Sequence, residues 1–190
     1  MSGIGVYPGS FDPPTVAHLA IAEAARDQAG LDRVVLAVSR QALGKGQGAG
    51  PRLADRLAVL TAIADRLGWL GVVLTDRQLI ADVSAGYDAV IVGADKWAQI
   101  LDPVWYESLE ARDAAVARLP RVLVAPRPPF SPTGIKLLEV APEHHEISSS
   151  AVRAGRREWM APEAAAFDDD TGAWSDPARY SRWCARNHPA

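Results

Sequence analysis

Short apolar segments alternate with amphipathic segments along most of this 190-residue chain. We expect the apolar segments to be strands, at residues 4–7, 33–39, 72–75, 89–92 and 122–125, with residues 136–140 as a candidate sixth. They are continuously apolar, which is typical of parallel strands covered on both faces. The order predicts an α/β fold of the Rossmann-like, doubly wound kind, with a mainly parallel sheet of five or six strands.

The segments between the strands have helical patterns. We expect helices at residues 15–29, 51–67, 77–85, 97–101, 104–119, from 148 onward, and 178–187. Gly30 is placed to end the first helix and Pro51 to begin the second. The acidic stretch 167–177 is expected to be a loop. We therefore predict one domain over residues 1–160 and a small helical C-terminal extension over 161–190, packed on the same domain.

Composition excludes several classes of protein. A hydrophobic content of 48% is typical of a globular chain, and the formal net charge of −3 argues against long nucleic acid as a partner. The single cysteine, Cys184, can form neither an internal disulfide nor a zinc site by itself. No apolar run reaches the roughly 18 residues that span a bilayer. We expect a cytoplasmic protein without a membrane partner, and the sequence leaves a homo-oligomer open.

The segment from Gly9 to His18 follows the first predicted strand. In parallel α/β folds, ligands bind beyond the carboxyl ends of the strands. Gly9 and Ser10 permit a tight turn whose N–H groups can face a phosphate, and the following helix adds the positive end of its dipole. His18 lies in the first helical turn and points back toward that end. The alternative is an ordinary strand–turn–helix connection that happens to carry a histidine.

A second segment, Ile147 to Arg153, places three serines at the start of a predicted helix. Serine hydroxyls and unpaired backbone N–H groups at such a start can hold phosphate. Arg153 is four residues after Ser149, so it lies one turn further along the same face, and its guanidinium can grip phosphate oxygens. The alternative is a helix that is simply capped by serine.

Together the two segments resemble the signatures of the nucleotidylyltransferase superfamily. Gly9, Phe11, Pro13 and His18 match its GxFxPxxxxH pattern, and residues 147–153 resemble its ISSTxxR or ISSSxxR motif. The resemblance covers about residues 4–153. It implies that the phosphate of an acceptor attacks the α-phosphorus of a nucleoside triphosphate and that pyrophosphate leaves. The attacking phosphate is already ionised, so catalysis is mainly positioning and charge stabilisation.

The resemblance also implies a set of site residues. Those implied to bind ATP are Gly9, Ser10, Phe11, His18, Gly93, Asp95, Ile147, Ser148, Ser149, Ser150 and Arg153. Those implied to be catalytic are His18, Thr15, Arg153 and Lys45. Lys45 lies in a glycine-rich loop from which it could reach the phosphates, or it is a solvated lysine. Mg²⁺ is implied as a companion of the triphosphate, held by phosphate oxygens and water, without a metal site of protein ligands.

The acceptor is less constrained than the reaction. Thr15 stands where the common HxxH form has histidine. Pantetheine-phosphate adenylyltransferases and eukaryotic-type nicotinamide mononucleotide adenylyltransferases also have threonine there. Gly93-Ala94-Asp95 resembles instead the GAD segment of the pyridine-nucleotide enzymes, where the aspartate holds a ribose hydroxyl of the adenosine; a helix N-cap is the alternative. Trp97 and Trp105 can stack on a pyridine ring or pack in the core. We expect Thr15, Lys45, Trp97 and Trp105 to contact the acceptor.

Three functions remain open. The leading hypothesis is transfer of AMP from ATP to nicotinate or nicotinamide mononucleotide. The second is adenylyl or cytidylyl transfer to another phosphorylated acceptor, such as phosphopantetheine. The third, of a different class, is a nucleotide-binding module without catalysis. The segment after the second strand, Ser39-Arg40-Gln41, lacks the Pro-Pro-His-Lys type of loop of the bacterial nicotinate enzymes, which keeps the alternatives open.

Overall fold

The computed structural model describes residues 3–40 and 50–187. It contains one parallel sheet with the strand order β3-β2-β1-β4-β5. The strands are β1 (Gly3–Pro8), β2 (Leu31–Ser39), β3 (Leu70–Thr75), β4 (Ala89–Gly93) and β5 (Arg121–Ala125). The predicted α/β architecture is therefore confirmed, with five strands in the sheet. Because the chain leaves β1 toward β2 on one side and β4 lies on the other, the strand order reverses beside β1.

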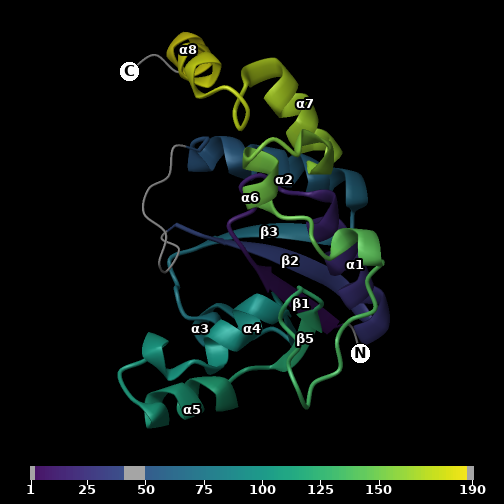
Figure 1. Cartoon of the computed structure of the whole chain (residues 1–190), viewed down its shortest axis with the longest axis vertical. Coiled ribbons are helices and arrows are strands. Elements are labelled where there is room, and N and C mark those ends of the chain that lie inside the picture. The colour runs from purple at the N-terminus through teal and green to yellow at the C-terminus, as the bar shows by residue number, and fades with distance from the viewer. Residues whose placement is uncertain (1–2, 41–49, 188–190) are drawn as a thin grey trace.

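Helices cover both faces of the sheet (Figure 1). They are α1 (Val16–Ala29), α2 (Leu53–Leu67), α3 (Ile80–Val83), α4 (Ala94–Leu101), α5 (Leu109–Ala117), α6 (Ser149–Arg153), α7 (Pro162–Thr171) and α8 (Pro177–Asn187). Short 3-10 helices are η1 (Pro103–Trp105), η2 (Pro142–His144) and η3 (Arg157–Trp159). Within residues 3–40 and 50–187, every helix is too short or too polar to cross a membrane.

The alternation of side chains along each strand explains the two layers. Val34, Leu36 and Val38 belong to a core cluster that also contains α1 and α2 residues, whereas Ala37 of the same strand belongs to a second cluster with α3 and α4. Successive strand residues point to opposite faces, so a continuously apolar strand serves both cores. This is the physical basis of the apolar runs in the sequence.

The candidate sixth strand at residues 136–140 is wrong. Leu137 makes only an isolated parallel bridge with Val124, and Leu138 donates its N–H to the Val124 carbonyl at 2.8 Å. The next residue then turns away from the sheet, because the Glu139 N–H donates to Gln28 Oε1 at 3.0 Å and its carbonyl accepts from Gln28 Nε2 at 2.8 Å. The Gln28 side chain of α1 thus forms the backbone hydrogen bonds that a neighbouring strand would otherwise form.

The predicted loop at 167–177 is wrong in its first part, since α7 continues through Thr171. The buried Asp168 carboxylate accepts the Trp174 N–H at 2.7 Å and the Ser175 N–H at 3.0 Å, which ties the turn after α7 to the helix. An acidic residue in a stretch predicted to be a loop therefore lies inside a helix and caps the turn that follows it. The last helix, α8, lies where the sequence predicted it, and α7 contacts α2.

Candidate active site

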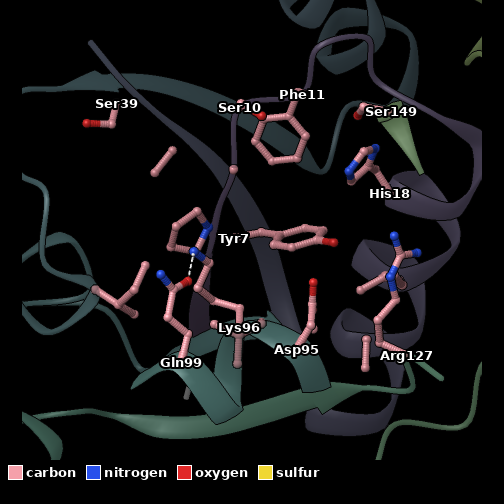
Figure 2. A pocket seen from close by; sticks show the side chains of 18 of the residues that line it. Tyr7, Ser10, Phe11, His18, Ser39, Asp95, Lys96, Gln99, Arg127 and Ser149 are labelled. Atoms are coloured by element: carbon pink, nitrogen blue, oxygen red, sulfur yellow. Dashed lines mark hydrogen bonds between the residues drawn. The ribbon is translucent and has the colours of Figure 1, made fainter. Parts of the chain in front are cut away.

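A pocket of about 370 Å³ opens at the carboxyl ends of the strands. Each strand brings residues to it: Gly9 after β1, Ser39 at the end of β2, Thr75 at the end of β3, Asp95 after β4 and Arg127 after β5. Figure 2 shows Ser39, Asp95 and Arg127 among the side chains that line this pocket. This is the place expected for a ligand in a doubly wound sheet.

The loop from Gly9 to Phe11 has an unusual backbone. Phe11 has a φ of 44°, in the left-handed region that residues with a side chain rarely adopt, and only 1% of it is exposed. A Cβ on Gly9 would lie 2.8 Å from the Phe11 ring, so only glycine fits there. The Gly9 N–H donates to the Ala37 carbonyl at 3.0 Å. The expectation that the N–H groups of the Gly9–Ser10 turn face a phosphate is therefore wrong for Gly9, which instead makes room for Phe11.

His18 and Thr15 form a reciprocal cap at the start of α1. The Thr15 N–H donates to His18 Nδ1 at 3.0 Å, and Thr15 Oγ1 lies 2.8 Å from the same nitrogen. A backbone N–H can only donate, so Nδ1 is an acceptor and the neutral ring carries its proton on Nε2. The His18 ring lines the pocket beside Phe11 (Figure 2), with the ring centroids 5.1 Å apart.

Thr15 is fully buried and does not line the pocket. The expectation that it contacts the acceptor is therefore wrong. Its hydroxyl is engaged at the helix cap, where it orients the imidazole of His18. Capping explains the threonine at this position, because residues with a short side chain that carries an oxygen are preferred at the N-cap.

The serine segment contacts the first signature segment directly. Ser149 Oγ donates to the Pro13 carbonyl at 2.7 Å, and Arg153 donates to the Asp12 carbonyl. Ser148 is the N-cap of α6 and accepts the Ala151 N–H at 3.1 Å. The residues of this segment that line the pocket are Ile147, Ser148, Ser149, Ser150 and Arg153. The two motifs thus form one continuous wall.

Asp95 lies at the opposite wall, in the first turn of α4. Gly93 is the N-cap of this helix, so Asp95 is not the cap. Burial, followed by the negative charge of Asp95, raises the pKa of Tyr7 well above its ordinary value, although the Arg127 guanidinium acts in the opposite direction. Tyr7 is therefore a neutral phenol between Asp95 and Arg127, as Figure 2 shows.

The two tryptophans have different environments. Trp105 lines the pocket and is 43% exposed. Trp97 packs against the core cluster that contains Val92 and Ile100, and it does not line the pocket, so its expected contact with the acceptor is wrong. Trp97 lies three residues after the buried Ala94 and therefore shares the face of α4 that packs in this cluster. Lys45, also expected here, lies outside the described residues.

The sequence identified Arg153 as a basic residue of the pocket but not Arg77, Lys96 or Arg127. Among the described residues, its basic side chains are Arg77, Lys96, Arg127 and Arg153, against the single carboxylate of Asp95. An anionic ligand is favoured there although the whole chain is acidic. Arg127 also donates to the Ile147 carbonyl at 2.7 Å, which joins β5 to the serine segment. Its position directly after a strand was the signal that could have identified it.

Comparison with known proteins agrees with this geometry. The family model described as cytidylyltransferase-like matches residues 6–155. A probable nicotinate-nucleotide adenylyltransferase of Salinibacter ruber is 61% identical over 31 residues, a match that spans 16% of each chain. The structure of the Plasmodium falciparum nicotinic acid mononucleotide adenylyltransferase complexed with NaAD superposes with a TM-score of 0.57, at 14% identity over 90% of this chain and 96% of that one.

The family model spans every element from within β1 to just beyond α6, and so includes both signature segments and Asp95. The structural likeness independently supports the fold. The chain therefore belongs to the cytidylyltransferase-like family.

Proposed function

We propose that this protein is an adenylyltransferase that transfers AMP from ATP to the phosphate of nicotinate or nicotinamide mononucleotide and releases pyrophosphate. The observation that carries the proposal is the joining of the two signature segments, through Ser149 and Arg153, around a pocket with a net positive lining. The family match supports nucleotidyl transfer. The names of the Salinibacter and Plasmodium proteins support the choice of acceptor.

The arrangement of donors supports this reaction. An acceptor phosphate oxygen attacks the α-phosphorus, and the bond from that phosphorus to the bridging oxygen of the β-phosphate breaks. Nδ1 of His18 is anchored by Thr15, so Nε2–H is the donor presented to an α-phosphate oxygen as negative charge builds. Arg153 and the serine-rich start of α6 hold the leaving pyrophosphate. Because the acceptor phosphate is already ionised, no strong base is needed.

Mg²⁺ fits this site as a companion of the nucleotide. Within residues 3–40 and 50–187, no group of three or more histidine, cysteine, aspartate or glutamate side chains could hold a metal ion. Of the described residues that line the pocket, Asp95 alone carries a carboxylate. A cation that keeps its water and phosphate ligands, and that neutralises triphosphate charge, suits such a site.

At the wall opposite the triphosphate, Asp95 is exposed in the pocket and can accept from the ribose hydroxyls of the adenosine. Trp105 and the neighbouring Tyr106 offer aromatic faces to a pyridine ring. Thr15 does not distinguish between acceptors, because it is buried at the helix cap. The product would be a dinucleotide, so we place the protein in NAD biosynthesis in the cytoplasm.

The test is an acceptor panel with ATP and Mg²⁺, followed by pyrophosphate release. Nicotinate mononucleotide, nicotinamide mononucleotide and phosphopantetheine are compared at equal concentration, and CTP replaces ATP in a parallel series. Release with a pyridine mononucleotide is the expected result. Release with phosphopantetheine alone would overturn the acceptor, and ATP binding without release for any acceptor would indicate a binding module.

A further inference from the structure

The C-terminal extension reaches the first signature segment. Trp174 lies in the turn between α7 and α8, beyond the residues matched by the family model. Its indole Nε1–H donates to Asp12 Oδ1 at 2.8 Å, and only 7% of Trp174 is exposed. Two further contacts hold the segment just before α7 against this loop: the Ala161 N–H donates to the Pro14 carbonyl at 3.0 Å, and Met160 bridges to Thr15.

Asp12 in turn contacts the signature arginine. Arg153 donates to the Asp12 carbonyl, and its Nη1 lies 3.9 Å from Asp12 Oδ2. The aspartate therefore has Trp174 on one carboxylate oxygen and Arg153 near the other. A hydrogen bond to a charged group restrains that group more strongly than one between neutral partners. The position of Asp12 thus couples the extension to the triphosphate wall.

Trp174 is itself rigidly held. The buried Asp168 accepts its backbone N–H at 2.7 Å and also accepts from Arg157 Nη2 at 2.7 Å. The Phe167 ring lies edge-on to the indole, with centroids 6.1 Å apart. An anchor whose backbone and ring are both fixed can set the direction of the group that it holds.

The extension has a second attachment, which is independent of Asp12. Tyr180 of α8 donates to the Asp55 carboxylate and accepts the Arg52 N–H at 2.9 Å, at the start of α2. Arg52 and Asp55 also form a two-bond ion pair, at 2.9 and 3.0 Å. Loss of the indole N–H alone should therefore leave the extension docked.

We propose that Trp174 is a positioning residue for nucleotide binding: it holds Asp12 Oδ1, and Asp12 thereby orients Arg153 toward the triphosphate. This inference rests on the proposed function for its catalytic meaning, because it assigns the extension to the same site. It predicts an effect on ATP affinity that passes through Asp12. A purely structural role in packing would lower stability without such coupling.

The first test compares Trp174→Phe with Trp69→Phe, a matched change at a tryptophan whose ring lies over Arg26. We expect Trp174→Phe to weaken the binding of ATP alone, measured by calorimetry, about tenfold, which corresponds to about 1.4 kcal/mol. In turnover, the KM for ATP should rise by a similar factor and kcat should stay within about twofold. Equal ATP affinity in Trp174→Phe and Trp69→Phe would overturn the proposal.

The second test is a double-mutant cycle with Asp12→Ala. If Trp174 acts through Asp12, adding Trp174→Phe to Asp12→Ala should change the affinity for ATP less than about twofold. If the decreases in ATP affinity caused by the two single substitutions instead multiply in the double variant, the indole acts by another route, which would contradict the proposal.

A third readout separates this inference from the proposed function. Hydrogen exchange in the nucleotide-free protein should become faster in Trp174→Phe for peptides that contain α6 and Asp12, and should not change there in Trp69→Phe. If the wild type shows no pyrophosphate release, the proposed function fails, and the exchange result still decides whether Trp174 orders the loop. Unchanged exchange in Trp174→Phe would overturn the positioning role even in an active enzyme.

Discussion

The two walls of the pocket are built differently. The triphosphate wall, residues 9–18 and 147–153, is held by contacts that involve the main chain, such as Ser149 to the Pro13 carbonyl and the Thr15 N–H to His18. The acceptor wall, around α4 and η1, carries large side chains that remain open: Trp105 is 43% exposed and the neighbouring Val104 is 75% exposed. One wall is fixed by the backbone, and the other presents side chains.

This difference explains what each wall can specify. A triphosphate is the same in every member of a reaction class, so a rigid frame of cap, turn and short helix suits it. Acceptors differ in shape, and exposed side chains can change without disturbing the fold. We therefore expect substitutions in the triphosphate wall to affect ATP binding, the chemical step or stability, and those in the acceptor wall to affect the KM for the acceptor.

The largest effect should come from His18. We expect His18→Asn to lower kcat by roughly 10², because the proton donor at Nε2 is lost from the developing charge on the α-phosphate. The asparagine oxygen can still accept the Thr15 N–H, so the midpoint of thermal unfolding should stay close to that of the wild type. Steady-state kinetics and calorimetry give the two values.

His18→Ala is the matched control, because it loses both the donor and the cap. Its kcat should be as low as that of the asparagine variant, and its stability should fall by about 1 kcal/mol. An asparagine variant with wild-type kcat would remove His18 from the proposed role and would erase the contrast between the walls.

Trp105 tests the acceptor wall. Trp105→Ala should raise the KM for the mononucleotide about fivefold and leave the KM for ATP unchanged, since an aromatic contact contributes about 1 kcal/mol. Trp97→Phe, at the core-packed tryptophan, should change neither KM value. Equal effects of Trp105→Ala on both KM values would show that the walls are not separate.

The helix cap should give a smaller effect. Thr15→Val keeps the size of the side chain and the backbone N–H that donates to His18, but it removes the hydroxyl. We expect a loss of about 1 kcal/mol in the free energy of unfolding and a decrease in kcat of about threefold. Denaturant titration and turnover measure these. A raised KM for the mononucleotide without a change in kcat would instead restore Thr15 as an acceptor contact.

The smallest effect concerns Glu163, which lies in neither wall and pairs with Arg66. Burial raises the pKa of Glu163. The hydrogen bond and charge of Arg66, together with a backbone hydrogen bond, lower this pKa by more than burial raises it, so the pKa is below its ordinary value. The pair therefore stabilises the fold above the unfolded-state pKa, and this contribution is lost as the pH falls through the folded-state pKa.

Glu163→Gln should cost about 0.5 kcal/mol at pH 7, since Arg66 is half-exposed and solvent screens the pair. The difference from the wild type should vanish toward pH 3 in unfolding titrations. An equal difference at both pH values would contradict the ion-pair explanation, and a change in either KM would show that α7 influences the pocket through this pair.

The fold could be predicted from the sequence where local pattern and tertiary structure agree. The apolar run around Leu36 is a strand because both faces of the sheet are covered. The failures lie where a distant partner decides. Residues 136–140 leave the sheet because Gln28 takes the backbone of Glu139, and residues 167–171 are helical while the buried Asp168 caps the turn. Neither partner is visible in a local window of sequence.

The site could be predicted where backbone constraints appear as glycine, proline and serine. Those residues identified the triphosphate wall. The positive φ of Phe11 could not be predicted in this way, because phenylalanine rarely adopts that conformation. The three-residue spacing of Trp97 from Ala94 was the sequence signal for its packing in the core. The contact of Trp174 with Asp12 spans 162 positions of sequence, so only the folded structure shows it.

The central claim is that the bond to the α-phosphorus breaks in this pocket. The most direct measurement follows ATP labelled either at the α- or at the γ-phosphorus during incubation with nicotinate mononucleotide and Mg²⁺. We expect the α-label to appear in the dinucleotide product and the γ-label to appear in pyrophosphate. A γ-label on the acceptor would show phosphoryl transfer instead and would contradict the account.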